Sequence, residues 1–325
     1  FGHSGEKAIG DFFLNGKGKR FKSQLSKKEY QDLIDFEGNA NGFKILSETK
    51  NGVEGGLRLS YATLGAFMKY PKESLPKRPS SNISDKKYGI FQSEKDFFLE
   101  VAKELGLQNR GDNKDISFSR HPLAFLVEAA DDICYTIIDF EDGINLGLID
   151  EEFALEYLIK LVKDNINTNK YHSLTKSSDR LAYLRSLAIN TLVAEVASVF
   201  INNEEAILNG KFTTSLLDKS KYKAQVDDII KISIQKIYKS NNVIDKEIAG
   251  YKILNTLLDV FTNSVENYKS GTITQLDQLI LNDLILEHSD DSSMYQLLIE
   301  VCNYISRLTD SNAMLNFHKI NGNLI

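Results

Sequence analysis

Apolar positions recur every three to four residues along most of this 325-residue chain, which is the spacing of a buried helix face. Segments with this spacing are 94–107, 122–143, 150–165, 178–200, 221–239, 245–268, 273–287 and 293–308. Alternation with a period of two, which is typical of strands, is nearly absent. The pattern therefore predicts an all-α fold, with Asn, Asp and Gly marking the gaps between helices.

The segment 122–143 carries an unusual polar face. Pro122 suits the first turn of a helix, where its missing N–H costs nothing, and His121 beside it is expected to cap or pack. At about 100° per residue, five polar side chains fall within about 80° of one another: Glu128, Asp131, Tyr135, Asp139 and Asp142. No Lys or Arg lies between Arg120 and Asp142 to relieve the repulsion among these carboxylates. The face indicates a bound cation, and the alternative is an ordinary solvated acidic face.

Composition narrows the classes of function. The net charge is −6, which disfavours nucleic-acid binding through a basic surface. Cys134 and Cys302 form no metal-binding pair or disulfide framework, and Cys134 is expected to be a small buried residue. No apolar run approaches the roughly 18 residues that span a bilayer, so no membrane partner is expected. A reducing cytoplasm is the expected location.

A proline-rich stretch predicts a long loop. Three of the four prolines lie between residues 70 and 79, in a Lys/Ser-rich stretch that reaches Lys87. Loops of this length within a helical protein are usually functional. Beyond about residue 177 the chain reads as a second helical layer without another acidic face.

Several longer motifs occur along the chain. Their order identifies a protein family more specifically than any single motif does. They are Phe-Gly-His-Ser-Gly-Glu-Lys at 1–7, Phe-Glu-Gly-Asn-Ala-Asn-Gly-Phe at 36–43, the stretches 61–71 and 87–95, Glu-Ala-Ala-Asp-Asp-Ile-Cys-Tyr at 128–135 with Asp139 beyond it, and 304–313. In this order they resemble the bacterial deoxyguanosinetriphosphate triphosphohydrolases of the HD-domain superfamily. Asn41 stands where that family has Gln, and Arg307-Leu308 stand where it has Gly-Met.

The resemblance implies an HD-type helical bundle with a C-terminal helical extension. Residues 1–176 would be the C-terminal portion of the catalytic core, with a substrate loop at 70–93, and residues 177–325 would pack on it. The superfamily binds its metal through a His, a His-Asp pair and a later Asp, which matches Asp131. The other three ligands are expected before Phe1, since no His-Asp dipeptide occurs in the sequence. The chain alone is therefore expected to be inactive.

The resemblance also assigns roles to individual residues. His3 and Glu6 would transfer protons beside the α-phosphate, and their i, i+3 spacing lets Glu6 orient the imidazole. A triphosphate carries about four negative charges and needs cations, which matches Lys69 and Lys87. Tyr70 follows Lys69, and the Asn39 amide can both donate and accept a hydrogen bond, so both are candidate substrate contacts. In the family, the residue that Tyr135 matches lies near the deoxyribose. Asp139 would bind the 3′-hydroxyl.

The expected reaction is attack of water on the α-phosphorus of a dNTP, which releases deoxynucleoside and tripolyphosphate. Mg²⁺ or Mn²⁺ is the expected metal, although a His/Asp site accepts several divalent ions. The resemblance further implies a homo-oligomer, often a hexamer, and a second dNTP as an activator. Base preference stays open.

Two alternatives remain at this stage. One is a non-catalytic module that binds dNTPs or supports assembly, which the missing metal ligands favour. The other is a different HD-type phosphohydrolase acting on nucleoside monophosphates or cyclic nucleotides, which the two loop lysines disfavour.

Overall fold

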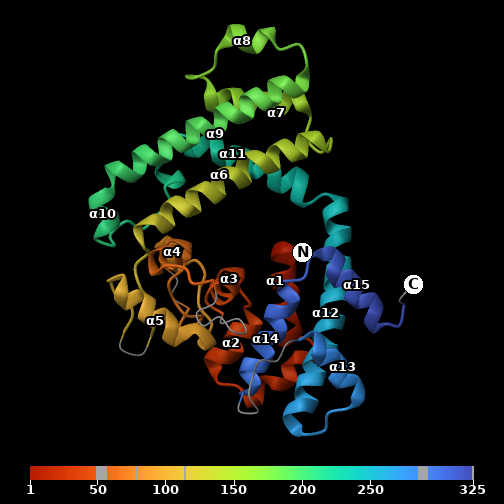
Figure 1. Ribbon diagram of the computed structural model, residues 1–325. Helices are drawn as coiled ribbons and strands as arrows, with labels where there is room; N and C mark the ends of the chain where they lie inside the picture. Colours follow the sequence, from red (N-terminus) through yellow and green to blue (C-terminus); the bar gives the residue numbers. More distant parts are fainter. Residues whose placement is uncertain (49–56, 78–79, 113–114, 285–291, 324–325) are drawn as a thin grey trace.

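The computed structural model describes residues 1–48, 57–77, 80–112, 115–284 and 292–323. These residues form helices and loops, and the described part contains isolated β-bridges but no strand (Figure 1). The all-α prediction is confirmed. The α-helices are α1 (Gly2–Leu14), α2 (Lys27–Ile34), α3 (Gly38–Ser47), α4 (Tyr61–Phe67), α5 (Lys95–Glu104), α6 (Pro122–Asn145), α7 (Glu151–Val162), α8 (Thr168–Ser173), α9 (Ser177–Asn202), α10 (Glu204–Leu208), α11 (Lys223–Ser233), α12 (Asn241–Ser270), α13 (Gln275–Asp283), α14 (Met294–Ser306) and α15 (Asp310–Ile320).

Each segment with helical spacing contains a helix, although the boundaries differ by a few residues. The segment 221–239 divides into α11 and a π-helical turn, η5 (Ile234–Tyr238). The segment 273–287 ends outside the described residues. Short helices such as α2 and α3 were not predicted, because fewer than three turns show little periodicity. Shorter 3₁₀ turns are η1 (Lys17–Gln24), η2 (Ile83–Asp85), η3 (Gln92–Glu94) and η4 (Leu217–Lys219).

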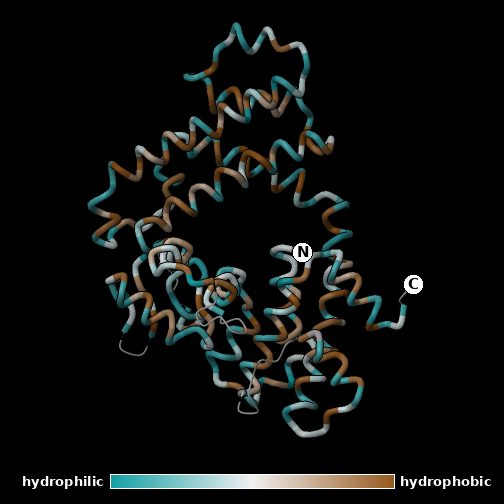
Figure 2. Tube along the Cα trace, in the orientation of Figure 1, coloured by the Kyte–Doolittle hydropathy of each residue, from teal (hydrophilic) through white to brown (hydrophobic). Residues whose placement is uncertain are grey.

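Three apolar clusters hold these helices together. The first joins the two ends of the chain, since α1 and α2 pack with α12 to α14. The second lies among α6, α7, α9 and α11, which form the upper part of Figure 1. The third lies among α3, α4 and α5. Brown apolar positions recur along the long helices in Figure 2, as burial of one face requires. The predicted boundary between two regions, at residues 176 and 177, stays a prediction. The second cluster contains residues from both sides of this boundary.

Helix α9 corrects the expectation that no apolar run approaches the length needed to span a bilayer. Its 26 residues include a window long and apolar enough to cross a membrane, with 33% of that window buried. The core helix of a globular protein passes the same test. Here Leu184, Ala188 and Leu192 are fully buried in the second cluster, so α9 is a packed element of the fold.

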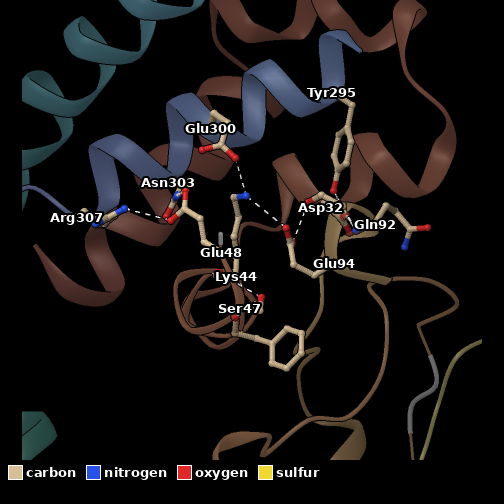
Figure 3. A network of polar contacts seen from close by, with 12 residues as sticks. Asp32, Lys44, Ser47, Glu48, Gln92, Glu94, Tyr295, Glu300, Asn303 and Arg307 are labelled. Carbon is tan, nitrogen blue, oxygen red and sulfur yellow. Dashed lines mark hydrogen bonds and ion pairs between the residues drawn. The ribbon is translucent and has the colours of Figure 1, made fainter. Parts of the chain in front are cut away.

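A buried polar network fixes α14 against α2 and α3 (Figure 3). The Lys44 ammonium lies 2.6 Å from Glu300 and 3.3 Å from Glu94. The Asp32 carboxylate accepts hydrogen bonds from the Tyr295 hydroxyl and the Gln92 backbone N–H. A buried charge is tolerated when it is paired, as Lys44 is here, so the network specifies how the C-terminal helices dock on the N-terminal ones.

Candidate functional site

Helix α6 presents the predicted polar face. His121 caps its first turn, because the Nδ1 atom accepts a hydrogen bond from the Leu123 N–H at 3.3 Å, which confirms the capping interpretation. Ile133, Ile137 and Phe140 are buried against the second cluster. Cys134 is exposed, which corrects the expectation that it is buried, because it lies about 100° around the helix from Ile133.

The cations missing from the α6 sequence come from other segments. The Arg120 guanidinium binds both carboxylate oxygens of Glu128, at 2.5 and 2.9 Å, and both side chains are buried. Lys69 lies 2.6 Å from Asp131. Arg185 of α9 lies 2.8 Å from Glu141. Glu128 is therefore a structural partner of Arg120, and the polar face open to a ligand begins at Asp131.

Asp131 is an exposed carboxylate at the near end of this face. Its side chain is 69% exposed, and among the described residues it pairs with Lys69. Within the described ranges, no three His, Cys, Asp or Glu residues lie close enough to hold a metal ion. The described residues therefore do not make a complete metal site, and Asp131 stays a predicted ligand. Burial and the charge of Glu128 raise the pKa of neighbouring Asp132 to about 6.

Tyr135 and Asp139 meet at the far end of the face, together with a residue that sequence reasoning missed. The ring of Tyr238 stacks on Tyr135 with a centroid distance of 5.8 Å and an interplanar angle of 20°. The Tyr238 hydroxyl donates a hydrogen bond to the Asp139 carboxylate. Burial and this hydrogen bond raise the pKa of Tyr238. Tyr238 ends the π-helical turn η5, a distortion that often marks functional sites and that helical spacing does not reveal.

A second group gathers at the junction of α1 and α3. The Lys87 ammonium lies 3.0 Å from Glu37 Oε1 and 4.0 Å from Glu6 Oε2. Glu37 Oε1 also accepts hydrogen bonds from the Asn39 N–H and side-chain amide, at 3.3 and 2.7 Å. Glu37 thus links Asn39 to Lys87. It was not among the predicted site residues, although the 36–43 motif contains it.

Glu6 is held by the backbone at the start of α3. The Gly38 N–H donates to Glu6 Oε1 at 2.9 Å, and a β-carbon at Gly38 would press on that oxygen. Burial and nearby Glu37 raise the pKa of Glu6, while Lys87, the Gly38 N–H and His3 lower it. A carboxyl group with a raised pKa is suited to proton transfer near neutral pH.

An open cleft of about 490 Å³ brings these residues together. His3, Glu6, Glu37 and Lys87 line it. His3 is exposed, at the first turn of α1. The structure thus places the residues predicted for proton transfer beside one of the two predicted phosphate-binding lysines.

Tyr70 lies near the start of α6, through its contact with Arg120. It is buried, and the Arg120 guanidinium lies 5.5 Å from its ring centroid. Burial raises the pKa of Tyr70 to about 12, with contributions from the charges of Glu128, Glu37 and Asp132. Arg120 also pairs with Glu128 of α6, so Tyr70 lies beside the first turns of α6.

Comparison with known proteins shows relatives that match almost the whole chain. No protein-family model matches the chain. The chain is 38% identical over 333 residues to a deoxyguanosinetriphosphate triphosphohydrolase-like protein of Synechocystis, covering 99% of this chain and 73% of that protein. A like-named protein of Listeria monocytogenes is 30% identical, covering 99% and 74%. A deoxyguanosinetriphosphate triphosphohydrolase of Enterobacter is 26% identical, covering 98% and 70%.

The helical fold and these relatives define the class as a family of helical triphosphohydrolases. The chain belongs to the deoxyguanosinetriphosphate triphosphohydrolase family, because the similarity extends over almost all of its length.

Proposed function

We propose that the full-length protein hydrolyses dNTPs to deoxynucleoside and tripolyphosphate, by attack of water on the α-phosphorus. The observation that carries this proposal is the group formed by Glu6, Glu37 and Lys87 in the cleft beside His3. It combines groups able to transfer protons with a cation able to bind phosphate. Family membership supports the same reaction class.

Each side chain has a separate task in this proposal. Lys69 and Lys87 bind the triphosphate, and Tyr70 and Asn39 contact it beside them. Glu6 holds the His3 imidazole in the tautomer needed to give or accept a proton at the reacting phosphate. Tyr135 lies against the deoxyribose and Asp139 accepts a hydrogen bond from the 3′-hydroxyl. A ring packed at C2′ leaves no room for a ribonucleotide hydroxyl, which gives selectivity for dNTPs.

The proposal includes a divalent ion, Mg²⁺ or Mn²⁺, with Asp131 as one ligand. The described residues supply too few donors to hold it, so no step is derived through the metal. Lys69, 2.6 Å from Asp131, balances that carboxylate here. A homo-oligomer, such as a hexamer, a second dNTP as activator and a cytoplasmic location are further parts of the proposal.

The deciding experiment gives each dNTP to full-length protein with Mg²⁺ or Mn²⁺ and identifies the products. Deoxynucleoside and intact tripolyphosphate are expected in equal amounts. Release of pyrophosphate with dNMP, or of single phosphates, would place the protein in another reaction class. The variant Lys87→Met serves as the matched negative control.

A second candidate is a dNTP-binding module without turnover. The incomplete set of metal donors among the described residues favours it for this chain by itself. Calorimetry with dGTP, run beside the product assay, separates the two. Binding without products supports the module, whereas products at any rate above that of Lys87→Met support the enzyme.

A further inference from the structure

One buried guanidinium ties the segment after α4 to the start of α6. Helix α4 ends at Phe67 and lies beside the first turns of α6 (Figure 1). Arg120 precedes α6, and its side chain is 0% exposed. Its Nε–H donates a hydrogen bond to the Lys69 carbonyl oxygen at 2.5 Å, while its two other nitrogens bind Glu128. Because the guanidinium is planar and rigid, it fixes the Lys69 backbone relative to α6.

The backbone leads Arg120 to this carbonyl group. The segments on either side of the contact run antiparallel, and the Phe118 N–H donates to the Pro71 carbonyl oxygen at 2.9 Å. In an antiparallel pair, a step forward along one segment is a step back along the other. Arg120 therefore lies opposite Lys69, and its side chain extends the pairing to that residue.

The other end of Lys69 is also held by α6. Its ammonium group lies 2.6 Å from Asp131, and its side chain is 17% exposed. Asp131 follows Glu128 by three residues, so the two carboxylates are neighbours on one face of α6. The carbonyl group and the ammonium group of Lys69 are thus both tied to this face, the first through Arg120 and the second directly.

The guanidinium also lies against two aromatic rings. Its carbon atom is 5.5 Å from the ring centroid of Tyr70 and 5.1 Å from that of Phe125. Both rings are buried, and a guanidinium close to an aromatic ring is attracted to it. Arg120 therefore holds Lys69 and Tyr70, which are consecutive in the sequence, by two different kinds of contact.

A buried ion pair is an inefficient way to stabilise a fold. Desolvation of the two charges offsets much of their attraction, and apolar residues of similar volume often replace such a pair without loss of stability. The pair supplies geometry instead, because a planar group with several donors holds its partners in fixed directions. The contact from Arg120 to the Lys69 carbonyl oxygen is not needed to neutralise Glu128, so charge balance alone does not explain it.

We propose that Arg120 is a positioning residue for the dNTP site, which holds Lys69 where its ammonium group can bind the triphosphate beside Asp131. Arg120 itself touches no substrate atom and acts through Lys69. The inference rests on the proposed function, in which Lys69 binds the triphosphate and Asp131 binds the metal. If Arg120 served the fold alone, its loss would lower the amount of folded protein and leave the affinity for substrate unchanged.

The test separates position from stability in full-length protein. The double variant Arg120→Met/Glu128→Met replaces the ion pair by apolar side chains, so the protein should stay folded. KM for the preferred dNTP should rise about tenfold at nearly constant kcat, which is the effect of losing one charge-assisted contact that is made before and during the reaction. The matched control, Arg185→Met/Glu141→Met, removes another Arg–Glu pair of α6 and should keep the parent KM.

A double-mutant cycle shows whether Arg120 acts through Lys69. In a Lys69→Met background, the Arg120→Met/Glu128→Met substitution should change KM by less than about twofold, because the group that Arg120 positions is gone. An equal rise in KM in both backgrounds, or no rise in the parent, overturns the proposal. If melting temperatures show that the Met pair does not fold, Arg120→Lys takes its place in the cycle, since it keeps a charge for Glu128 without the planar group.

Lysine labelling separates failure of this inference from failure of the proposed function. Acetylation of Lys69, followed by mass spectrometry of the full-length protein, needs no turnover. Lys69 should react faster in Arg120→Met/Glu128→Met than in the parent, whereas Arg185→Met/Glu141→Met should match the parent. Equal rates in all three proteins overturn the positioning role even where dNTPs are hydrolysed. Faster labelling in a protein that releases no tripolyphosphate from any dNTP supports the positioning of Lys69, and only the proposed function fails.

Discussion

The Tyr238 hydroxyl donates a hydrogen bond to the Asp139 carboxylate, across 99 residues of sequence. The same tyrosine stacks on Tyr135, one turn earlier in α6 than Asp139. One side chain thus orients both residues that are proposed to bind the deoxyribose. The contact also connects η5, just before α12, to the α6 face.

This contact predicts graded effects on dNTP use. Asp139→Asn removes a charged acceptor and should lower kcat/KM by about tenfold to a hundredfold, corresponding to about 1.5–3 kcal/mol. Tyr238→Phe keeps the stacked ring but removes the donor, so a smaller loss is expected. Steady-state kinetics of full-length protein measure both. A larger loss in Tyr238→Phe than in Asp139→Asn would contradict the assignment of Asp139 as the sugar contact.

Tyr135→Ala is expected to change selectivity more than stability. The side chain is 46% exposed, so its truncation should cost well below the about 3–5 kcal/mol of a buried aromatic. Ribonucleotides should then compete better with dNTPs. The measurements are NTP inhibition and melting temperature, with Tyr135→Phe as the control. An unstable variant with unchanged discrimination would remove Tyr135 from the site.

Asp131→Ala should abolish metal-dependent turnover in full-length protein while the fold is kept. The Asp131 side chain is 69% exposed, so its truncation leaves no cavity in the core, although Lys69, whose side chain is 17% exposed, loses this ion pair. Asp132→Ala, about 100° further around α6, should retain most of the activity. The measurements are the activity and the circular dichroism of the two variants. If Asp132→Ala is inactive and Asp131→Ala retains activity, the metal ligand is Asp132.

The Arg120–Glu128 pair predicts a large stability effect. Their side chains are 0% and 7% exposed, so Glu128→Gln leaves a buried guanidinium without its counter-charge. We expect a loss of about 3–5 kcal/mol in the free energy of unfolding. Asp227→Asn breaks the exposed pair with Lys223 and should cost at most about 1 kcal/mol. Urea unfolding measures both, and equal losses would contradict the structural role of the pair.

Asp32 predicts how stability depends on pH. Burial raises its pKa from 3.8 to about 7, so the folded state holds a proton that the unfolded state has lost within this window. Stability should therefore fall as pH rises from 3.8 to about 7, by at most about 1.4 kcal/mol per pH unit from this group. Above that window its contribution is constant.

Asp32→Asn mimics the protonated carboxyl and should flatten this part of the pH profile. Its amide oxygen can still accept from Tyr295 and the Gln92 N–H. Chemical denaturation between pH 4 and 8 provides the comparison. Identical slopes for parent and variant would show that Asp32 stays ionised in the folded protein.

The sequence by itself determined the long helices, because their apolar spacing is encoded locally, and it named candidate site residues that stay predictions. Apolar spacing fixes which face of α6 is buried, and Pro122 with His121 fixes where the helix begins. The ordered motifs likewise indicated the family, and similarity to its members over most of the chain confirmed this prediction. Short helices such as α2 and α3 escaped this reasoning because their stability comes from packing rather than from their own periodicity.

Only the tertiary structure decided which charges meet. Glu128 reads as part of an open acidic face until Arg120 is seen to bind it. Lys69 reaches Asp131 across 62 residues, Glu37 joins Asn39 to Lys87, and Tyr238 reaches Asp139. Spacing along one helix fixes the relative directions of its own side chains. The partner of each depends on how distant helices pack, which no local pattern contains.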